Sequence, residues 1–328
     1  MQLQQLAYFV AVADHRHFTH AARAVHVAQP SLSKQIAGLE AELGGPLFNR
    51  ARGNITLTAA GETLLPLARR ILADAETAQT AVREVVGLRR GRVRLGATPS
   101  LSTALVPQVL RRFHDRYPGV RLVLEEGGSR DLVDKLAQGA LDLALIILPL
   151  HTDDPALQTF PVLREPLVAA LPPGHALGRR AHVRITDLRD VPLVMFREGY
   201  DLREVTLAAC RKAGFEPTFA VEGGEMDAVL QMVQAGLGVA IVPSMVMRSP
   251  SARLADLHAV PFSRPRLGRT VALAHRRDVE LSAAAEEFSR ATRDLVDEWG
   301  ASGALGPDTQ VLGQGSRVSE ANLKVRGT

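Results

Sequence analysis

The spacing of the apolar residues changes once along the chain, near Gly91, and this change limits the folds that the chain can adopt. Before Gly91, apolar residues recur every three or four positions, which is the spacing of one face of a helix. After it, strand-like runs alternate with helical spacings, which is typical of α/β domains. The sequence therefore predicts a mainly helical N-terminal part and an α/β C-terminal part with a mainly parallel sheet.

Residues 1–58 have the pattern of a helix-turn-helix followed by a wing. The third expected helix opens at Gln29-Pro30, because proline suits the first helical turn. Its inward-facing stripe comprises Leu32, Ile36, Leu39 and Leu43. Residues 46–58 are expected to form two short strands, with Arg50 and Arg52 near the tip that joins them. The adjacent Gly53-Asn54 pair favours a turn.

A long helix is expected from about residue 59 to 88, and Thr58 is placed to cap it. Its apolar residues alternate spacings of four and three: Leu64, Ala68, Ile71, Ala75, Ala78, Val82 and Val85. A repeat of about 3.5 residues is typical of a coiled-coil seam, which needs a partner helix. We therefore expect residues 59–90 to be a linker that carries a dimer seam. An ordinary amphipathic helix is the alternative.

An internal similarity links two parts of the C-terminal pattern. Residues 126–131 resemble residues 222–227 at an offset of 96 residues, and each segment joins a strand to a helix through a glycine turn. This predicts two related subdomains, I (91–160 with 262–300) and II (161–261), although chance similarity of two α/β units remains open. Such turns face the ligand crevice of open α/β sheets.

Several classes of protein find no support in the composition and motifs. No run of about 18 uncharged apolar residues could span a membrane, and the first twelve residues lack the features of a leader, which favours a cytoplasmic protein. The single cysteine, Cys210, excludes an internal disulfide. His15, His17 and His20 cluster without a completing carboxylate pair, and phosphate-loop and nucleophile-elbow motifs are absent. We expect no enzyme, metal or cofactor.

The positive charge is concentrated at the N-terminus. Residues 1–90 contain 10 Lys or Arg and 7 Asp or Glu, whereas residues 91–300 contain 26 of each. This distribution favours a polyanion partner for the N-terminal part, with a solvated basic face as the alternative. Residues 301–328 are polar without a period and are expected to form a disordered tail.

The N-terminal part contains a recognisable set of residues: Leu6, Phe9, Val12-Ala13, Phe18-Thr19, Ala21-Ala22, Ala28-Gln29-Pro30-Ser31-Leu32-Ser33, Gln35-Ile36, Leu39-Glu40, Leu43-Gly44, Leu47-Phe48, Arg50, Leu57-Thr58 and Ala60-Gly61. This set resembles the N-terminal motif of the LysR-type transcriptional regulators. The resemblance continues more loosely to about residue 300. It implies a winged helix-turn-helix, a linker helix and a two-subdomain effector-binding module that resembles periplasmic binding proteins.

The resemblance also implies partners and sites. The N-terminal part of the second helix of such a motif enters the major groove of DNA, which predicts DNA-binding residues Gln29, Pro30, Ser31, Ser33, Lys34, Arg50 and Arg52. An effector, expected to be a small anion, would bind between the subdomains at Thr98, Ser100, Ser129, Phe196 and Arg197. Homodimers or tetramers, a dyad-symmetric operator and RNA polymerase complete the expected partners.

Two further interpretations concern the C-terminal module. The two-subdomain module alone is compatible with a solute-binding protein, although the helix-turn-helix argues against one. The segment 199–204 resembles the sensing loop of the peroxide-sensing branch of the family, with Asp201 in place of the reactive cysteine and Cys210 in place of the second one. Without a partner thiol no disulfide switch can form, so Cys210 is expected to be a small buried side chain.

Overall fold

The computed structural model describes residues 1–51, 54–85, 91–150, 155–250, 252, 256–263, 266–306 and 308–313. The chain forms two compact units, one of residues 1–88 with 135–140, and the other of residues 89–134 with 141–328. Within the described residues, no helix is both long and apolar enough to cross a membrane.

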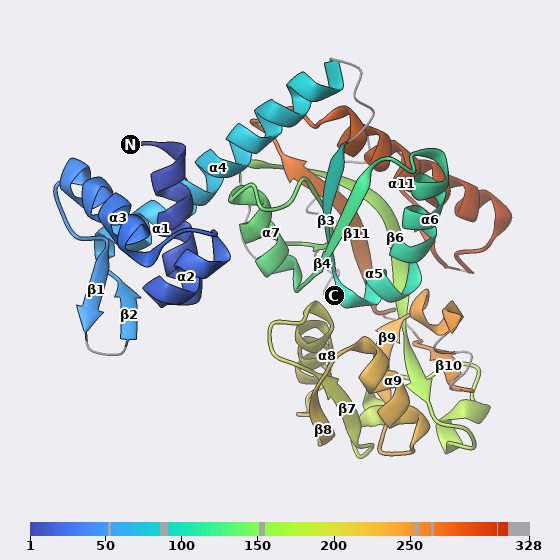
Figure 1. Cartoon of the computed structure of the whole chain (residues 1–328). Coiled ribbons are helices and arrows are strands. Elements are labelled where there is room, and N and C mark those ends of the chain that lie inside the picture. Colours follow the sequence, from blue (N-terminus) through green and yellow to red (C-terminus); the bar gives the residue numbers. More distant parts are fainter. Residues whose placement is uncertain are drawn as a thin grey trace. The chain divides into compact units, whose positions relative to one another are not determined.

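The N-terminal unit contains the expected winged helix-turn-helix (Figure 1). Its elements are α1 (Leu3–His15), α2 (Phe18–Ala24), α3 (Gln29–Leu43), β1 (Phe48–Ala51) and β2 (Asn54–Leu57). Leu32, Ile36 and Leu39 are fully buried in one cluster with residues of α1 and α2. Leu43, expected in the same stripe, is 47% exposed, because α3 ends there and Gly44 turns the chain away with a φ of 78°.

Side-chain contacts from α3 and from Thr58 hold the wing in place, and the sequence pattern predicted only the one from Thr58. Glu40 Oε1 of α3 accepts from the backbone N–H groups of Leu47 and Phe48, at 2.9 and 3.4 Å. Thr58 Oγ1 accepts from Gly61 N at 3.1 Å, which confirms Thr58 as the cap of the next helix. A side chain at Gly61 would lie 2.2 Å from the carbonyl of Leu47, so only glycine allows this approach.

Helix α4 (Ala59–Val85) carries the expected heptad stripe, but the stripe residues in its first half pack within their own chain. Ala68 is fully buried in the helix-turn-helix core, and Leu64 and Ile71 pack against that core. Ala68 is therefore wrong as a position for contact with a partner. Leu67 and Val82 are instead 51% and 65% exposed. Ala75 and Ala78 keep their place as seam predictions, while the side chain of Val85 lies outside the described part of the chain.

The C-terminal unit has two lobes, each with its own core (Figure 1). Lobe I comprises β3 (Arg92–Ala97), α5 (Pro99–Ala104), α6 (Val106–Arg116), β4 (Arg121–Glu126), α7 (Ser129–Ala137), β5 (Leu143–Leu148) and α11 (Ala283–Ser302). Lobe II comprises β7 (Leu193–Phe196), α8 (Asp201–Lys212), β8 (Phe219–Gly224), α9 (Met226–Gln234), β9 (Ala240–Pro243) and β10 (His258–Pro261), with short 3-10 turns η1 (Ala176–Arg179), η2 (Ile185–Leu188) and η3 (Val246–Arg248).

Two long strands, β6 (Leu157–Leu171) and β11 (Gly268–Arg276), connect the lobes. They pair antiparallel with each other, and β11 pairs antiparallel with β5, whereas β3 pairs parallel with β4 and β5. The prediction of a mainly parallel sheet is therefore wrong for the large sheet. The connecting strands run against their neighbours because the chain passes from one lobe to the other and back again.

Other details of the C-terminal pattern also differ from expectation. The helical segment after β3 is divided into two helices, α5 and α6, which meet at Leu105. Pro107 lies in the first turn of α6, and its missing N–H cannot continue the hydrogen bonds of α5. The expected internal similarity is matched by geometry: β3 pairs parallel with β4, as β7 does with β8, and a glycine turn precedes both α7 and α9.

The expectation of a disordered tail is wrong for its described part. Helix α11 continues to Ser302, and β12 (Gln310–Val311) pairs with Leu163 and Arg164 of β6. Leu305 is buried in the core of lobe I. This order comes from sheet pairing and one buried leucine, which a search for helical or strand periodicity does not detect. Residues 314–328 lie outside the described part of the chain.

Candidate DNA-binding and effector sites

The N-terminal turns of α3 present a polar face opposite the buried stripe. Pro30, Ser31 and Lys34 are exposed, and Gln29 and Ser33 are partly exposed. The N-cap residue, Ala28, makes no side-chain cap, and neither serine hydroxyl bonds to the N-terminal turn of the helix within the described residues. Neither Ser31 nor Ser33 therefore caps the helix. Their hydroxyls and the Lys34 ammonium are available for DNA phosphates or base edges.

Only one of the two arginines predicted to contact DNA from the wing lies within the described residues. Arg50 lies in β1, opposite Ile55 of β2, so the predicted hairpin is confirmed around it. Arg52 lies outside the described residues. Among the residues that are described, no group of three or more His, Cys, Asp or Glu side chains could hold a metal.

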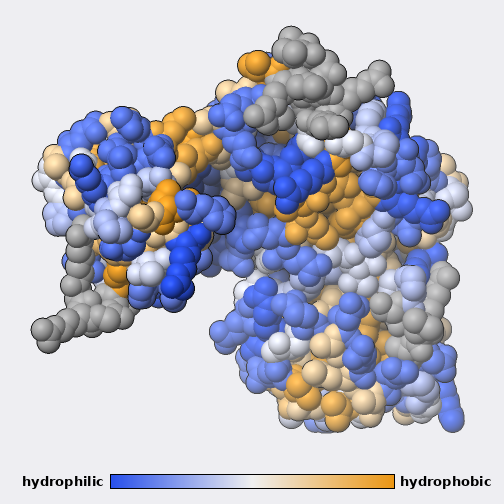
Figure 2. Space-filling view, viewed as in Figure 1, coloured by the Kyte–Doolittle hydropathy of each residue, from blue (hydrophilic) through white to orange (hydrophobic). Residues whose placement is uncertain are grey.

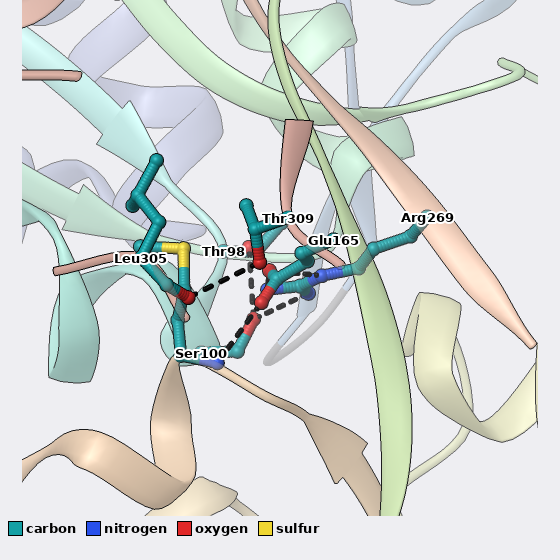
Figure 3. Close-up of polar contacts among 7 residues, drawn as sticks. Thr98, Ser100, Glu165, Arg269, Leu305 and Thr309 are labelled. Carbon is teal, nitrogen blue, oxygen red and sulfur yellow. Dashed lines mark hydrogen bonds and ion pairs between the residues drawn. The ribbon is translucent and has the colours of Figure 1, made fainter. Parts of the chain in front are cut away.

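The first two predicted effector residues lie at the end of β3, where they meet a buried ion pair (Figure 3). Thr98 and Ser100 are 2% and 0% exposed, and their hydroxyls are 3.4 Å apart. Ser100 Oγ accepts from Arg269 Nη1 at 2.7 Å. Ser100 therefore serves neither as a helix cap nor as a free ligand contact in this structure. Its hydroxyl links α5 to the strand that connects the lobes.

Arg269 and Glu165, which sequence reasoning missed, are cross-strand partners on β11 and β6. Arg269 Nη2 lies 2.7 Å from Glu165 Oε1, and both side chains are almost fully buried. The second carboxylate oxygen accepts from the backbone N–H of Met245 at 3.1 Å. The available signal was the presence of charged residues within two largely apolar strands. Buried charges need this complete pairing, because an unpaired one costs several kcal/mol, roughly 3–5.

The third predicted residue, Ser129, is one of the places where the two lobes are hydrogen-bonded. It is the first residue of α7, and its hydroxyl donates to Asp201 Oδ2 of lobe II at 2.8 Å. The same hydroxyl accepts from Ile147 N at 2.9 Å, and the Ser129 N–H points to the carboxylate at 3.4 Å. A side chain at Gly128 would lie 2.4 Å from Gly199 O, so the lobes also touch here. Asp201 thus occupies the positive end of α7.

The two residues predicted for the opposite wall behave differently from expectation. Phe196 is 1% exposed and stacks on the Tyr200 ring at 5.0 Å, so it belongs to the core of lobe II. Its side chain is packed into that core along with the rest of β7, and its role as a wall residue stays a prediction. Arg197 pairs with Glu225 at 2.6 Å, and this hydrogen bond raises the pKa of the guanidinium. Its charge is therefore already balanced.

Two further side chains of lobe II that carry a titratable group, Tyr200 and Cys210, are buried. The Tyr200 hydroxyl has no hydrogen-bond partner in the described part of the chain, and burial raises the pKa of this phenol. Cys210 is fully buried, as expected, and burial raises the pKa of its thiol to about 11. Low thiolate character argues against a reactive sensor cysteine.

Comparison with known proteins decides the family. The model for "Bacterial regulatory helix-turn-helix protein, lysR family" matches residues 3–62, and the model for "LysR substrate binding domain" matches residues 87–297. The chain belongs to the LysR family of transcriptional regulators. This LysR regulator therefore combines a DNA-binding domain with an effector-binding domain, and the solute-binding alternative has no support.

Curated relatives and solved structures agree with this assignment. This LysR regulator is 34% identical to a "Probable hydrogen peroxide-inducible genes activator" of Streptomyces viridosporus, over 90% of this chain and 94% of the relative. It is also 34% identical to the "Transcriptional dual regulator GltC" of Bacillus subtilis, over 88% and 95%.

Similar solved structures include a full-length OxyR variant from Pseudomonas aeruginosa, at 29% identity and a TM-score of 0.66, over 90% and 94% of the two chains. Another is full-length CbnR complexed with its target DNA, at 25% identity and a TM-score of 0.65, over 90% and 99%.

Proposed function

We propose that this LysR regulator reads its operator with the polar face at the start of α3, through Gln29, Pro30, Ser31, Ser33 and Lys34. The exposure of this face above a buried apolar stripe supports the proposal. Arg50 and Arg52 of the wing would contact the DNA backbone or minor groove. Its role is regulation of transcription in the cytoplasm rather than catalysis, as the names of its relatives suggest.

The proposed assembly is a homodimer or homotetramer on a dyad-symmetric operator, in contact with RNA polymerase. The exposed apolar side chains of α4 favour a helix pair between copies. The effector-binding unit offers a second surface: Figure 2 shows apolar colour over β4, where Val123 and Leu124 are 36% and 40% exposed. A dimer symmetric about a two-fold axis would read two half-sites related by the same symmetry.

Substitution of Ser33→Ala together with Lys34→Ala tests the DNA-binding face. Each phosphate that a copy no longer neutralises should reduce the slope of log affinity against log salt by about 0.9, because fewer counterions are released. Operator affinity and its salt dependence are measured by fluorescence anisotropy. Glu42→Gln, at the far end of α3, is the matched control. Unchanged affinity and slope in the double variant would show that α3 does not face DNA.

We further propose that a small anionic effector binds between the lobes by replacing the Asp201 carboxylate at Ser129. The observation that supports this is the hydrogen bond of Asp201 to the first residue of α7, a position that suits any carboxylate. Thr98 and the unpartnered Tyr200 hydroxyl, which has no hydrogen bond within the described residues, would supply further contacts. Binding of an effector carboxylate would then replace the interlobe hydrogen bond between Ser129 and Asp201 with a hydrogen bond from Ser129 to the effector. Loss of the interlobe bond changes the relative populations of the lobe arrangements.

Calorimetric titration tests this exchange with the metabolite that shifts the operator footprint. Asp201→Asn weakens the competing internal charge and should bind that metabolite more tightly, whereas Ser129→Ala and Thr98→Val should bind it more weakly. Glu204→Gln, exposed on the same helix as Asp201, should match the wild type. Wild-type affinity in Asp201→Asn and Ser129→Ala alike would place the effector elsewhere.

A further inference from the structure

The segment after α11 lies beyond the part of the chain matched by the family model, which ends at residue 297. We call residues 303–306 and 308–313 the strap. Its lobe I contacts begin at Ala304, whose N–H donates to the carbonyl of Trp299 at 2.9 Å. Leu305 is 2% exposed in the lobe I core, and β12 pairs with β6. Leu312 N adds a bond to the carbonyl of Val162 at 2.9 Å. The strap is therefore fixed to lobe I.

The same segment also bonds to lobe II. Arg248 of η3, whose neighbours Val246 and Met247 pack in the lobe II core, donates to the carbonyl of Ala304 at 3.1 Å. Its guanidinium covers the backbone of Gly306, where a side chain would lie 2.6 Å from Nη2. Asp308 pairs with Arg266, which precedes Leu267 at the edge of the lobe II core. Arg248 of lobe II and Arg266, which lies between β10 of lobe II and the connecting strand β11, thus bind a segment anchored in lobe I.

The strap lies beside the connecting strands at the point where the lobes meet. Figure 3 shows Leu305 and Thr309 next to the Glu165–Arg269 ion pair, and Thr309 Oγ1 donates to the carbonyl of Leu305 at 3.1 Å. β12 pairs with Leu163 and Arg164, immediately before Glu165 on β6. Because β6 and β11 connect the lobes, the strap bonds beside the strands that join them, to residues of lobe I and to Arg248 and Arg266.

We infer that the strap is an interlobe restraint, which holds the two lobes in one arrangement through Arg248 and Arg266. The lobe II contacts are exposed, at 50% of the side chain for Arg266 and 43% for Asp308. They can break without unfolding either lobe, because neither Arg266 nor Asp308 belongs to a lobe core. The strap therefore opposes the hinge motion of a two-lobe module, and its release allows a second arrangement.

The test measures the distance between spin labels on the two lobes of the effector-free, full-length protein. Labels are attached at Gln108→Cys of α6 and Lys212→Cys of α8, both exposed, in a Cys210→Ser background. The distance distribution is compared among the protein with the wild-type strap, the double variant Arg248→Ala with Arg266→Ala, and the single variant Asp308→Asn. Arg112→Ala, which removes an ion pair with Glu298 inside lobe I, is the matched control.

We expect the double variant to gain a second distance population and Asp308→Asn to shift partly toward it, while Arg112→Ala matches the wild type. Circular dichroism checks that every variant is folded. If the double variant does not fold, Asp308→Asn still tests the strap, because it retains both arginines. Distributions that match the wild type in the folded strap variants would overturn the inference. An equal change in Arg112→Ala would also overturn it, because the effect would not belong to the strap. No effector is needed, so this outcome is independent of the proposed effector site.

Discussion

At the scale of single residues, the Cys210 thiol allows a quantitative prediction. Its pKa is raised to about 11 from an ordinary value of 9.0, mainly by burial and then by Glu216. At pH 8 the folded protein should hold about 100-fold less thiolate than an ordinary cysteine, so a thiol reagent should react slowly until urea exposes the side chain. Peroxide should change operator affinity equally in wild type and Cys210→Ser. Rapid labelling of the native protein would contradict this prediction.

At the scale of elements, α4 divides its apolar stripe between two tasks. Its first half completes the helix-turn-helix core, while Leu67 and Val82 remain exposed. Leu67→Glu with Val82→Glu should separate the proposed dimer at micromolar concentration, since an unpaired charge buried in an apolar seam costs roughly 3–5 kcal/mol. Sedimentation velocity measures the oligomer, and Gln79→Glu, exposed on the same helix, is the control. A double variant that sediments as the wild type does would mean that another surface joins the copies.

At the scale of the whole molecule, local sequence patterns predicted most helices and strands. The strand directions, the partners of the site residues and the strap depend on long-range pairing. Hydroxyl residues after β3 and before α7 could be placed near a site because strand ends and helix starts are visible in the sequence. Their partners could not: Arg269 and Glu165 are 104 residues apart and meet only when β6 and β11 pair. The strand directions and the ordered strap depend on the same distant contacts, so no local periodicity could reveal them.

The strap is bonded directly to Trp299, the only tryptophan of the sequence. This side chain packs partly buried against the lobe I core at the end of α11. The next residue, Gly300, lies so close to Val311 of β12 that a side chain there would be 2.4 Å from it. The indole is thus a native optical probe beside the strap. Its emission wavelength and quenching should follow any detachment of β12 in the unmodified protein.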